Sequence, residues 1–273
     1  MLKMIYARMQ QGHRTTKYPD GPAPQVADRF RGAPTIDVAR CRDGCRACVE
    51  ACPTGAVTLG GKVRIDLGRC LFCTDCADAC PEHAIVYKND YRLAVGVRSD
   101  LIVEQDTQIL SLAAAMNAKL LKLFGRSLKL RQVSAGGCNA CEADINVLGT
   151  VGWDLGRFGI QLVASPRHAD GLLVTGPVTR NMELALKKTY DAVAEPKIVI
   201  AVGACAISGG PYLDHDQVRN GAEAVVPIDL YIPGCPPHPL TILDGMLRLL
   251  GRIEDGTERK PAGQARPADL IAS

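Results

Sequence analysis

Two cysteine runs decide the fold of the first part of the chain: residues 41–53 read CRDGCRACVEACP, and residues 70–81 read CLFCTDCADACP. The second run matches the pattern C-x2-C-x2-C-x3-C-P in full, and the first has one additional residue between Cys41 and Cys45. In this pattern, three closely spaced cysteines bind one iron–sulfur cubane and the fourth binds the neighbouring cubane. The runs therefore predict two clusters that exchange one ligand each.

The exchange predicts which cysteines share a cluster. One [4Fe–4S] cluster is expected on Cys41, Cys45, Cys48 and Cys80. The other is expected on Cys52, Cys70, Cys73 and Cys76. The spans 41–57 and 70–86 read as an internal repeat whose halves are too short to fold alone, so we expect a pseudo-symmetric unit stabilised by its metal. Residues 36–98 resemble a two-cluster ferredoxin, a small α+β domain.

The composition excludes several classes of protein. Of 273 residues, 47% are hydrophobic and 22% are charged, which is typical of a globular chain. The net charge of +3 and the lack of a Lys/Arg run argue against nucleic-acid binding. No stretch reaches the ~20 apolar residues of a membrane span, and the first residues form no signal peptide, so we expect a cytoplasmic chain. In that reducing compartment, dense cysteine indicates metal binding rather than disulfides.

Four further cysteines are scattered: Cys138 and Cys141 in GGCNACE, Cys205 in GACAISGG and Cys235 in PGCPPHP. Taken singly, the CxxC pair also suits a zinc half-site or a redox pair, and lone cysteines are usually small buried hydrophobic residues. Each of these cysteines is flanked by glycine, which permits the close backbone approach that a bulky cluster needs. Cys205 and Cys235 both follow predicted strands, where ligands bind in parallel α/β sheets.

The chain divides into segments of different character. From about Leu130 onward, alternating strands and helices predict an α/β sheet. The strands are expected in residues 128–133, 160–164, 171–175, 197–203 and 224–232 and the helices in 181–194 and 239–253. We expect Asn181 to be the N-cap of the first helix. An apolar stripe over residues 107–124 predicts a helix that packs on the core, a partner or, less simply, a membrane. The expected organisation is an irregular arm (1–35), a ferredoxin-like domain (36–98), a helical linker (99–129), an α/β domain (130–253) and a flexible tail (254–273).

Residues 123–237 resemble the small subunit of group 4 membrane-bound [NiFe] hydrogenases of the formate hydrogenlyase type, a family homologous to the 20 kDa subunit of complex I. The resemblance is carried by LFGRSL, GGCNACEADINVL, RFGIQLVASPRHADGLLVTGPVTRNM, GACAISGG and YIPGCPPHP. It implies a flavodoxin-like fold with a third [4Fe–4S] cluster, whose ligands are Cys138, Cys141, Cys205 and Cys235. The Cys138-Asn-Ala-Cys141 spacing favours the hydrogenase side, because the complex I subunit has adjacent cysteines there.

The resemblance implies an electron-transfer subunit with three [4Fe–4S] clusters and no catalytic residue of its own. The expected partners are a [NiFe] hydrogenase or complex I 49 kDa-like large subunit, other membrane-complex subunits and an electron donor, on the inner face of the membrane. One alternative is a complex I-like oxidoreductase without nickel. A second is a free-standing iron–sulfur or zinc protein.

Four polar residues accompany the third cysteine set. Glu142 is a candidate for a proton route or, equally, for an acid that stabilises a helix N-terminus. Arg167 and His168 are expected near the third cluster or, more simply, in ordinary surface contacts. His238 is expected to pack beside that cluster without binding it, since four cysteines already fill the site.

Overall fold

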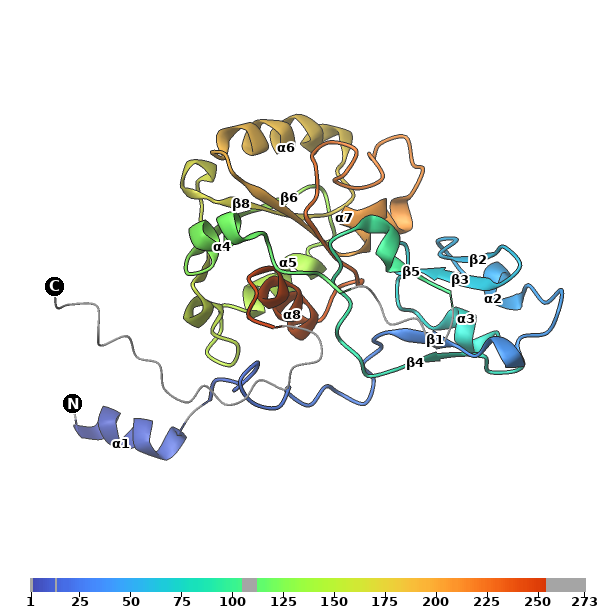
Figure 1. Cartoon of the computed structure of the whole chain (residues 1–273), viewed down its shortest axis with the longest axis horizontal. Helices are drawn as coiled ribbons and strands as arrows, with labels where there is room; N and C mark the ends of the chain where they lie inside the picture. Colours follow the sequence, from blue (N-terminus) through green and yellow to red (C-terminus); the bar gives the residue numbers. More distant parts are fainter. Residues whose placement is uncertain (1, 13, 105–111, 254–273) are drawn as a thin grey trace.

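The computed structural model describes residues 2–12, 14–104 and 112–253, and the chain forms two lobes (Figure 1). The larger lobe surrounds a parallel sheet, and the smaller lobe carries short antiparallel strands. The predicted flexible tail, residues 254–273, lies outside the described residues.

A five-stranded parallel sheet forms the larger lobe, in the order β10-β9-β8-β6-β7. The strands are β6 (Leu128–Ser134), β7 (Ile160–Leu162), β8 (Gly171–Thr175), β9 (Ile198–Val202) and β10 (Leu230–Ile232). Counted within this lobe, the order is that of a flavodoxin-like sheet, 2-1-3-4-5 read from β7. Every residue of β8 and β9 is buried, as expected for central strands covered on both faces. The predicted α/β fold is confirmed.

Helices cover both faces of this sheet (Figure 1). On one face, Leu186 of α6 (Arg180–Ala192) packs in a cluster with Leu172 and Val174 of β8. The other face contacts α5 (Ala140–Val147) and α8 (Pro239–Leu249). All of α8 is buried, which identifies it as the central helix of the core.

The smaller lobe is built from two short sheets and two single-turn helices. β1 (Pro34–Ile36) pairs with β4 (Ile85–Tyr87), and β2 (Val57–Leu59) pairs with β3 (Val63–Asp66), which also pairs with β5 (Ile102–Val103), all antiparallel. The helices α2 (Ala47–Glu50) and α3 (Asp75–Asp78) lie inside the two cysteine runs. Since β2 follows the first run as β4 follows the second, the lobe has the predicted internal repeat.

The two lobes share a core and a sheet edge. Val95 forms an antiparallel bridge with Tyr231 of β10, with N–H···O distances of 3.1 and 2.9 Å. Ala206 and Ile207 of the larger lobe belong to the same apolar cluster as Ile36 and Ile65 of the smaller lobe. Burial of apolar surface between lobes therefore fixes their relative position.

The segment before β1 holds to the larger lobe through a buried tyrosine. The Tyr18 hydroxyl donates to Asp244 Oδ1 over 2.6 Å, and Arg248 Nε donates to Asp244 Oδ2 over 2.8 Å. The Asp244 carboxylate lies in α8 and is almost fully buried. A buried carboxylate needs such partners, so this contact anchors the N-terminal arm on the central helix.

Two expectations for the terminal and linking segments are wrong. The arm is not irregular throughout, because residues of high helix propensity form the exposed helix α1 (Leu2–Gln11). Within residues 112–124, the helix predicted over residues 107–124 is reduced to α4 (Ala118–Phe124), and residues 107–111 lie outside the described part. Its start is fixed by Asn117, whose side chain accepts from Leu120 N over 3.1 Å.

Two boundaries in the larger lobe also differ from the prediction. The N-cap of α6 is Thr179 rather than Asn181, because the Thr179 carbonyl accepts the first helical bonds, from Met182 and Glu183. The strand predicted over 224–232 is reduced to β10, since residues 222–226 form a turn and Pro227 lacks the N–H that a strand ladder needs.

Short 3₁₀ helices complete the chain and connect the larger elements. They are η1 (Val38–Arg40), η2 (Arg98–Leu101), η3 (Leu155–Phe158), η4 (Pro166–His168) and η5 (Gly210–Tyr212), and a five-residue helix, α7 (Ala204–Ser208), follows β9. Among the described residues, none of the helices combines the length and the apolar character that crossing a bilayer requires.

Candidate iron–sulfur sites

The four scattered cysteines meet at the carboxyl edge of the parallel sheet. Cys138 and Cys141 lie at the start of α5, after β6, whereas Cys205 lies in α7 after β9 and Cys235 follows β10. Two backbone bonds join the last two loops: Gly203 N donates to Ile232 O and Ala204 N donates to Gly234 O, both over 2.8 Å. Residues almost a hundred positions apart in the sequence thus reach one place, as parallel topology predicts.

Glycine at position 203 makes this convergence possible. Its φ is +92°, in the region that favours glycine, and a Cβ placed there would lie 2.6 Å from Cys141 Sγ. Gly210 plays the same part beside Cys205, because its φ is +56° and a Cβ would lie 2.9 Å from Cys205 Sγ. The backbone therefore approaches the sulfur atoms more closely than any side chain permits.

Three thiols of this third set, those of Cys141, Cys205 and Cys235, do not ionise readily by themselves. Burial, with smaller contributions from Cys235 and Cys138, raises the pKa of Cys205 to about 12. Burial likewise raises the pKa of Cys141, followed by the effect of Cys205. Because thiolates, not thiols, bind metal, the four sulfurs require a positively charged centre to become a stable anionic set.

Two cavities in the smaller lobe are each lined by four cysteines. One is lined by Cys41, Cys45, Cys48 and Cys80. The other is lined by Cys52, Cys70, Cys73 and Cys76. Each cavity thus receives three cysteines from one run and one from the other, which is the grouping expected from the sequence pattern.

Backbone N–H groups point at the sulfurs of both cavities. Ala56 N lies 3.2 Å from Cys52 Sγ, and at the equivalent place in the repeat Ala84 N lies 3.3 Å from Cys80 Sγ. Phe72 N lies 3.3 Å from Cys70 Sγ. Donors aimed at sulfur stabilise the thiolate form, and they adjust the potential of a bound cluster.

The additional residue in the first run lies on the surface. Gly44 has a φ of +75° in this enlarged loop, and Arg42 forms an ion pair with Glu82, which follows the second run. The loop is therefore tied to the other half of the repeat. Because the Arg42 side chain is largely exposed, this ion pair contributes little to stability.

The two cysteine-lined cavities of the smaller lobe are suited to a cluster. A tetrahedral zinc site needs four ligand atoms at about 2.0–2.3 Å from one point. Cysteines spaced around a cavity instead fit a larger inorganic core, so the donor set favours an iron–sulfur cubane.

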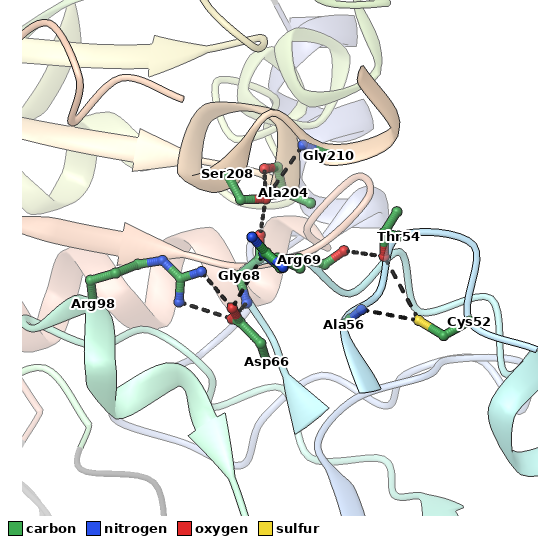
Figure 2. Close-up of polar contacts among 10 residues, drawn as sticks. All are labelled: Cys52, Thr54, Ala56, Asp66, Gly68, Arg69, Arg98, Ala204, Ser208 and Gly210. Carbon is green, nitrogen blue, oxygen red and sulfur yellow. Dashed lines mark hydrogen bonds and ion pairs between the residues drawn. The ribbon is translucent and has the colours of Figure 1, made fainter. Parts of the chain in front are cut away.

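A polar network joins the second cysteine set to the third (Figure 2). Ser208 Oγ, at the end of α7, lies 2.8 Å from the carbonyl oxygen of Gly68, two residues before Cys70. The loop of Gly68 is fixed by Asp66, whose carboxylate accepts from Gly68 N over 2.8 Å and from Arg98 over 2.9 and 2.7 Å. The helix that carries Cys205 is thereby joined to the loop that carries Cys70.

The same loop is tied to the cavity of the second set. Thr54 Oγ1 donates to Arg69 O over 2.8 Å, and Thr54 lies two residues after Cys52 (Figure 2). On the other side, Arg31 donates to the Cys73 carbonyl over 2.9 Å. The chain around the second set is therefore held from both sides.

The three sets form a row. Burial raises the pKa of Cys48, and Cys76 of the neighbouring set adds to the effect, so the first and second sets are adjacent. Burial also raises the pKa of Cys235, to which Cys138 and then Cys73 contribute, so the second and third sets are adjacent. The geometry agrees, because α2 contacts α3 and because Leu71 and Phe72 of the second run line one cavity with Cys235. The second set is therefore adjacent to each of the other two, an arrangement that the sequence does not reveal.

The third set ends the row at the protein surface. Cys138 and Cys235 are exposed, whereas Cys205 is buried. A shallow cavity beside Cys235 is lined by Pro236 and His238 from the larger lobe and by Leu71 and Phe72 from the smaller lobe. This open side is the face on which another molecule can approach the third set.

The polar residues near the third set have defined partners. Glu142 is buried and accepts from Ser134 Oγ and Thr175 Oγ1, both over 2.6 Å. Burial opposes ionisation, but these bonds hold the pKa of Glu142 below its ordinary value. His238 is the N-cap of α8, where its Nδ1 accepts from Leu240 N over 3.1 Å. Both side chains therefore support the loops of this site.

Of the two alternatives for Arg167 and His168, a place near the third set is excluded. They belong to η4, which precedes β8, and Gly171 of β8 pairs with Leu130 near the start of β6. Cys138 follows the opposite end of β6. Since the strands are parallel, these two residues lie at the amino edge of the sheet, away from the cysteines.

Comparisons with protein families identify both halves of the chain. The family described as NADH ubiquinone oxidoreductase, 20 Kd subunit, matches residues 138–249, and the family described as 4Fe-4S dicluster domain matches residues 40–84. Formate hydrogenlyase subunit 7 of Escherichia coli is 42% identical over 160 residues, which cover 58% of this chain and 63% of that protein. The probable membrane-bound hydrogenase subunit mbhJ of Pyrococcus furiosus is 42% identical, over 50% of this chain and 81% of that protein.

Two further similarities complete the comparison. A subunit of the NADH-quinone oxidoreductase of Phocaeicola vulgatus is 44% identical over 133 residues, which cover 48% of this chain and 66% of that protein. A chain in the structure of the membrane-bound sulfane sulfur reductase, an archaeal respiratory membrane complex, is 34% identical, with a TM-score of 0.44, over 52% of this chain and 78% of that chain. The family matches and the relatives confirm the resemblance inferred from the sequence.

The role of Gly203 generates a first prediction. Replacing Gly203 with Ala places a methyl group against Cys141 Sγ and strains a φ of +92°, so the third set should lose its cluster and about four iron atoms per chain. Iron analysis of anaerobically purified protein measures the loss. Gly152→Ala is the matched control, because a Cβ there meets nothing within 4 Å. An unchanged iron content in Gly203→Ala would contradict the geometry described for this site.

Proposed function

We propose that this chain, which belongs to the family of the NADH ubiquinone oxidoreductase 20 kDa subunit, is an electron-transfer subunit of a membrane-associated [NiFe] hydrogenase complex. The observation that carries the proposal is the row of three four-cysteine sets, the last of which opens on the surface at Cys138 and Cys235. A row of this kind is suited to carrying charge through a protein that is otherwise electrically insulating.

Three [4Fe–4S] clusters would be held by the three sets. When bound, each cluster supplies one-electron redox chemistry at a potential that its surroundings adjust. The first set is Cys41, Cys45, Cys48 and Cys80; the second is Cys52, Cys70, Cys73 and Cys76; the third is Cys138, Cys141, Cys205 and Cys235. The chain's own part is to hold these thiolates, to direct N–H donors at them and to keep the three sites at fixed distances.

The proposed route through the chain follows from the row. The smaller lobe would accept electrons from a donor subunit, and the third set would exchange them with a large subunit docked over Cys138 and Cys235. Flow in the reverse direction uses the same row. We assign no catalytic residue to this chain: all twelve cysteines belong to the three sets, so the cysteines of a nickel–iron site must come from the partner.

The proposed location is peripheral, on the inner face of a membrane and through partner subunits. Support comes from the names of the relatives, one of which is a membrane-bound hydrogenase subunit. The partners would be a [NiFe] hydrogenase or complex I 49 kDa-like large subunit, further subunits of the membrane complex and an electron donor.

A second function is favoured by a different relative, because a subunit of an NADH-quinone oxidoreductase is also 44% identical. In that case the large subunit would lack nickel and reduce another acceptor. Under the hydrogenase proposal, the chain purified anaerobically from its own cells with its partners should contain a large subunit with about one nickel. A stoichiometric large subunit that lacks nickel and supports quinone reduction would establish the second function instead.

Iron content tests the number of clusters. The full chain, purified or reconstituted anaerobically, should contain ~12 iron atoms, since three cubanes of four irons fill the twelve cysteines. Metal analysis with acid-labile sulfide determination makes the measurement. Zinc without iron would refute the iron–sulfur proposal, and ~8 irons would refute the count of three.

Paired substitutions test the exchange of ligands between the two runs. Cys80→Ala combined with Cys45→Ala removes two ligands of one proposed set and should leave ~8 irons. Cys80→Ala combined with Cys73→Ala removes one ligand from each set and should leave ~4 irons. If each run instead bound its own cluster, these two values would be reversed. Cys52→Ala combined with Cys73→Ala is the reciprocal control and should leave ~8.

A further inference from the structure

The hydroxyl of Tyr87 lies against two sulfurs of the second set. Tyr87 is the last residue of β4, and its Oη is 3.5 Å from Cys70 Sγ and 3.6 Å from Cys76 Sγ. It lines the same cavity as the four cysteines of that set. Its ring is held by an edge-to-face contact with Phe72, with centroids 6.2 Å apart at an interplanar angle of 65°. Packing against Phe72 therefore fixes the position of the phenol ring.

The direction of the hydrogen bond follows from the chemistry of the ligands. A cysteine sulfur bound to iron is a thiolate and has no proton to donate. The phenol O–H must then be the donor, and its single proton is shared between Cys70 and Cys76. A donor to ligand sulfur stabilises the more negative, reduced state of a cluster, and this raises the reduction potential.

The internal repeat shows that the second cysteine set has this hydroxyl donor and that the first set does not. Tyr87 lies seven residues after Cys80, and the residue seven positions after Cys52 is Leu59. Each of the two is the last residue of its strand, β4 or β2. Leucine has no donor and Leu59 is exposed, so the first set lacks the equivalent hydroxyl.

The other donors do not remove this difference. Ala84 N points at Cys80 of the first set in the way that Ala56 N points at Cys52 of the second, at 3.3 and 3.2 Å. These two bonds are matched by the repeat. The second set has, in addition, the Tyr87 hydroxyl and the 3.3 Å bond from Phe72 N to Cys70.

We propose that Tyr87 is a positioning residue that raises the reduction potential of the second site above the value its cysteines and backbone alone would give. The inference rests on the proposed function, because it requires a cluster in the second set. Since this set lies between the first and the third, a higher potential there favours transfer of an electron from the first set into the middle of the row.

Tyr87→Phe tests the inference, because it removes the hydroxyl and retains the ring that contacts Phe72. An anaerobic redox titration of the full chain, followed by electron paramagnetic resonance, measures the potential of each cluster. The step that disappears in Cys73→Ala identifies the second cluster. In Tyr87→Phe the midpoint potential of this step should become lower. The equilibrium constant for reduction should fall by up to roughly tenfold, which corresponds to about 59 mV for one electron. The steps of the first and third clusters should stay in place.

Tyr190→Phe, in α6, is the control for loss of a phenol elsewhere and should move none of the steps. An unchanged second step in a fully loaded Tyr87→Phe protein would overturn the inference. Loss of about four irons from Tyr87→Phe would overturn it as well, since the hydroxyl would then hold the site together rather than adjust its potential. Failure of the iron–sulfur part of the proposed function is distinct, because the unmodified chain would then contain no iron and give no steps.

Discussion

A buried thiolate is stable only when a positive charge or hydrogen-bond donors compensate it, because burial disfavours the ionised form of the side chain. In this chain burial raises the pKa of both Cys70 and Cys205 to about 12, so neither sulfur is charged by itself at neutral pH. Metal binding must therefore release protons and stabilise the fold at the same time. The glycines that let the backbone come close to sulfur, the N–H groups that point at sulfur and the short loops between strands all serve this need to hold buried thiolates. They bring four sulfurs together where ordinary side chains would keep them apart.

The contacts between the two lobes fix the three cysteine sets relative to one another. Transfer between sites depends on their separation, and here that separation is set by buried contacts and not by a flexible connection. Ser208 contacts Gly68, Val95 bridges to Tyr231, and the two lobes share one apolar cluster. The Tyr18 contact with Asp244 adds the N-terminal arm to the same rigid core. Two units that resemble separate proteins thus behave as one scaffold.

The sequence predicted those features that depend on local pattern. Cysteine spacing grouped the residues that line each cavity, and buried apolar runs predicted the five strands of the flavodoxin-like sheet. Features that depend on competition between nearby residues were less predictable: Asn117 starts α4 later than the apolar stripe suggested, and Pro227 shortens β10. Long-range contacts of single polar side chains outside the cysteine motifs gave no signal. Arg167 lies at the wrong edge of the sheet, and neither Ser208 nor Tyr87 belongs to a motif whose spacing points to its partner.

The repeat of the smaller lobe shows which features of the two halves are the same and which differ: the cysteine-bearing backbone is similar, and the side chains at the strand ends are not. Both halves present four cysteines, a proline and an inward N–H at equivalent places, because four-sulfur coordination demands similar backbone geometry on each side. Side chains at the strand ends are under no such demand, and there Leu59 and Tyr87 differ. The enlarged first loop, tied by Arg42 to Glu82, is a second departure that keeps all ligands. A duplicated backbone can therefore hold two similar clusters, while a few side chains beside the sulfurs give them different potentials.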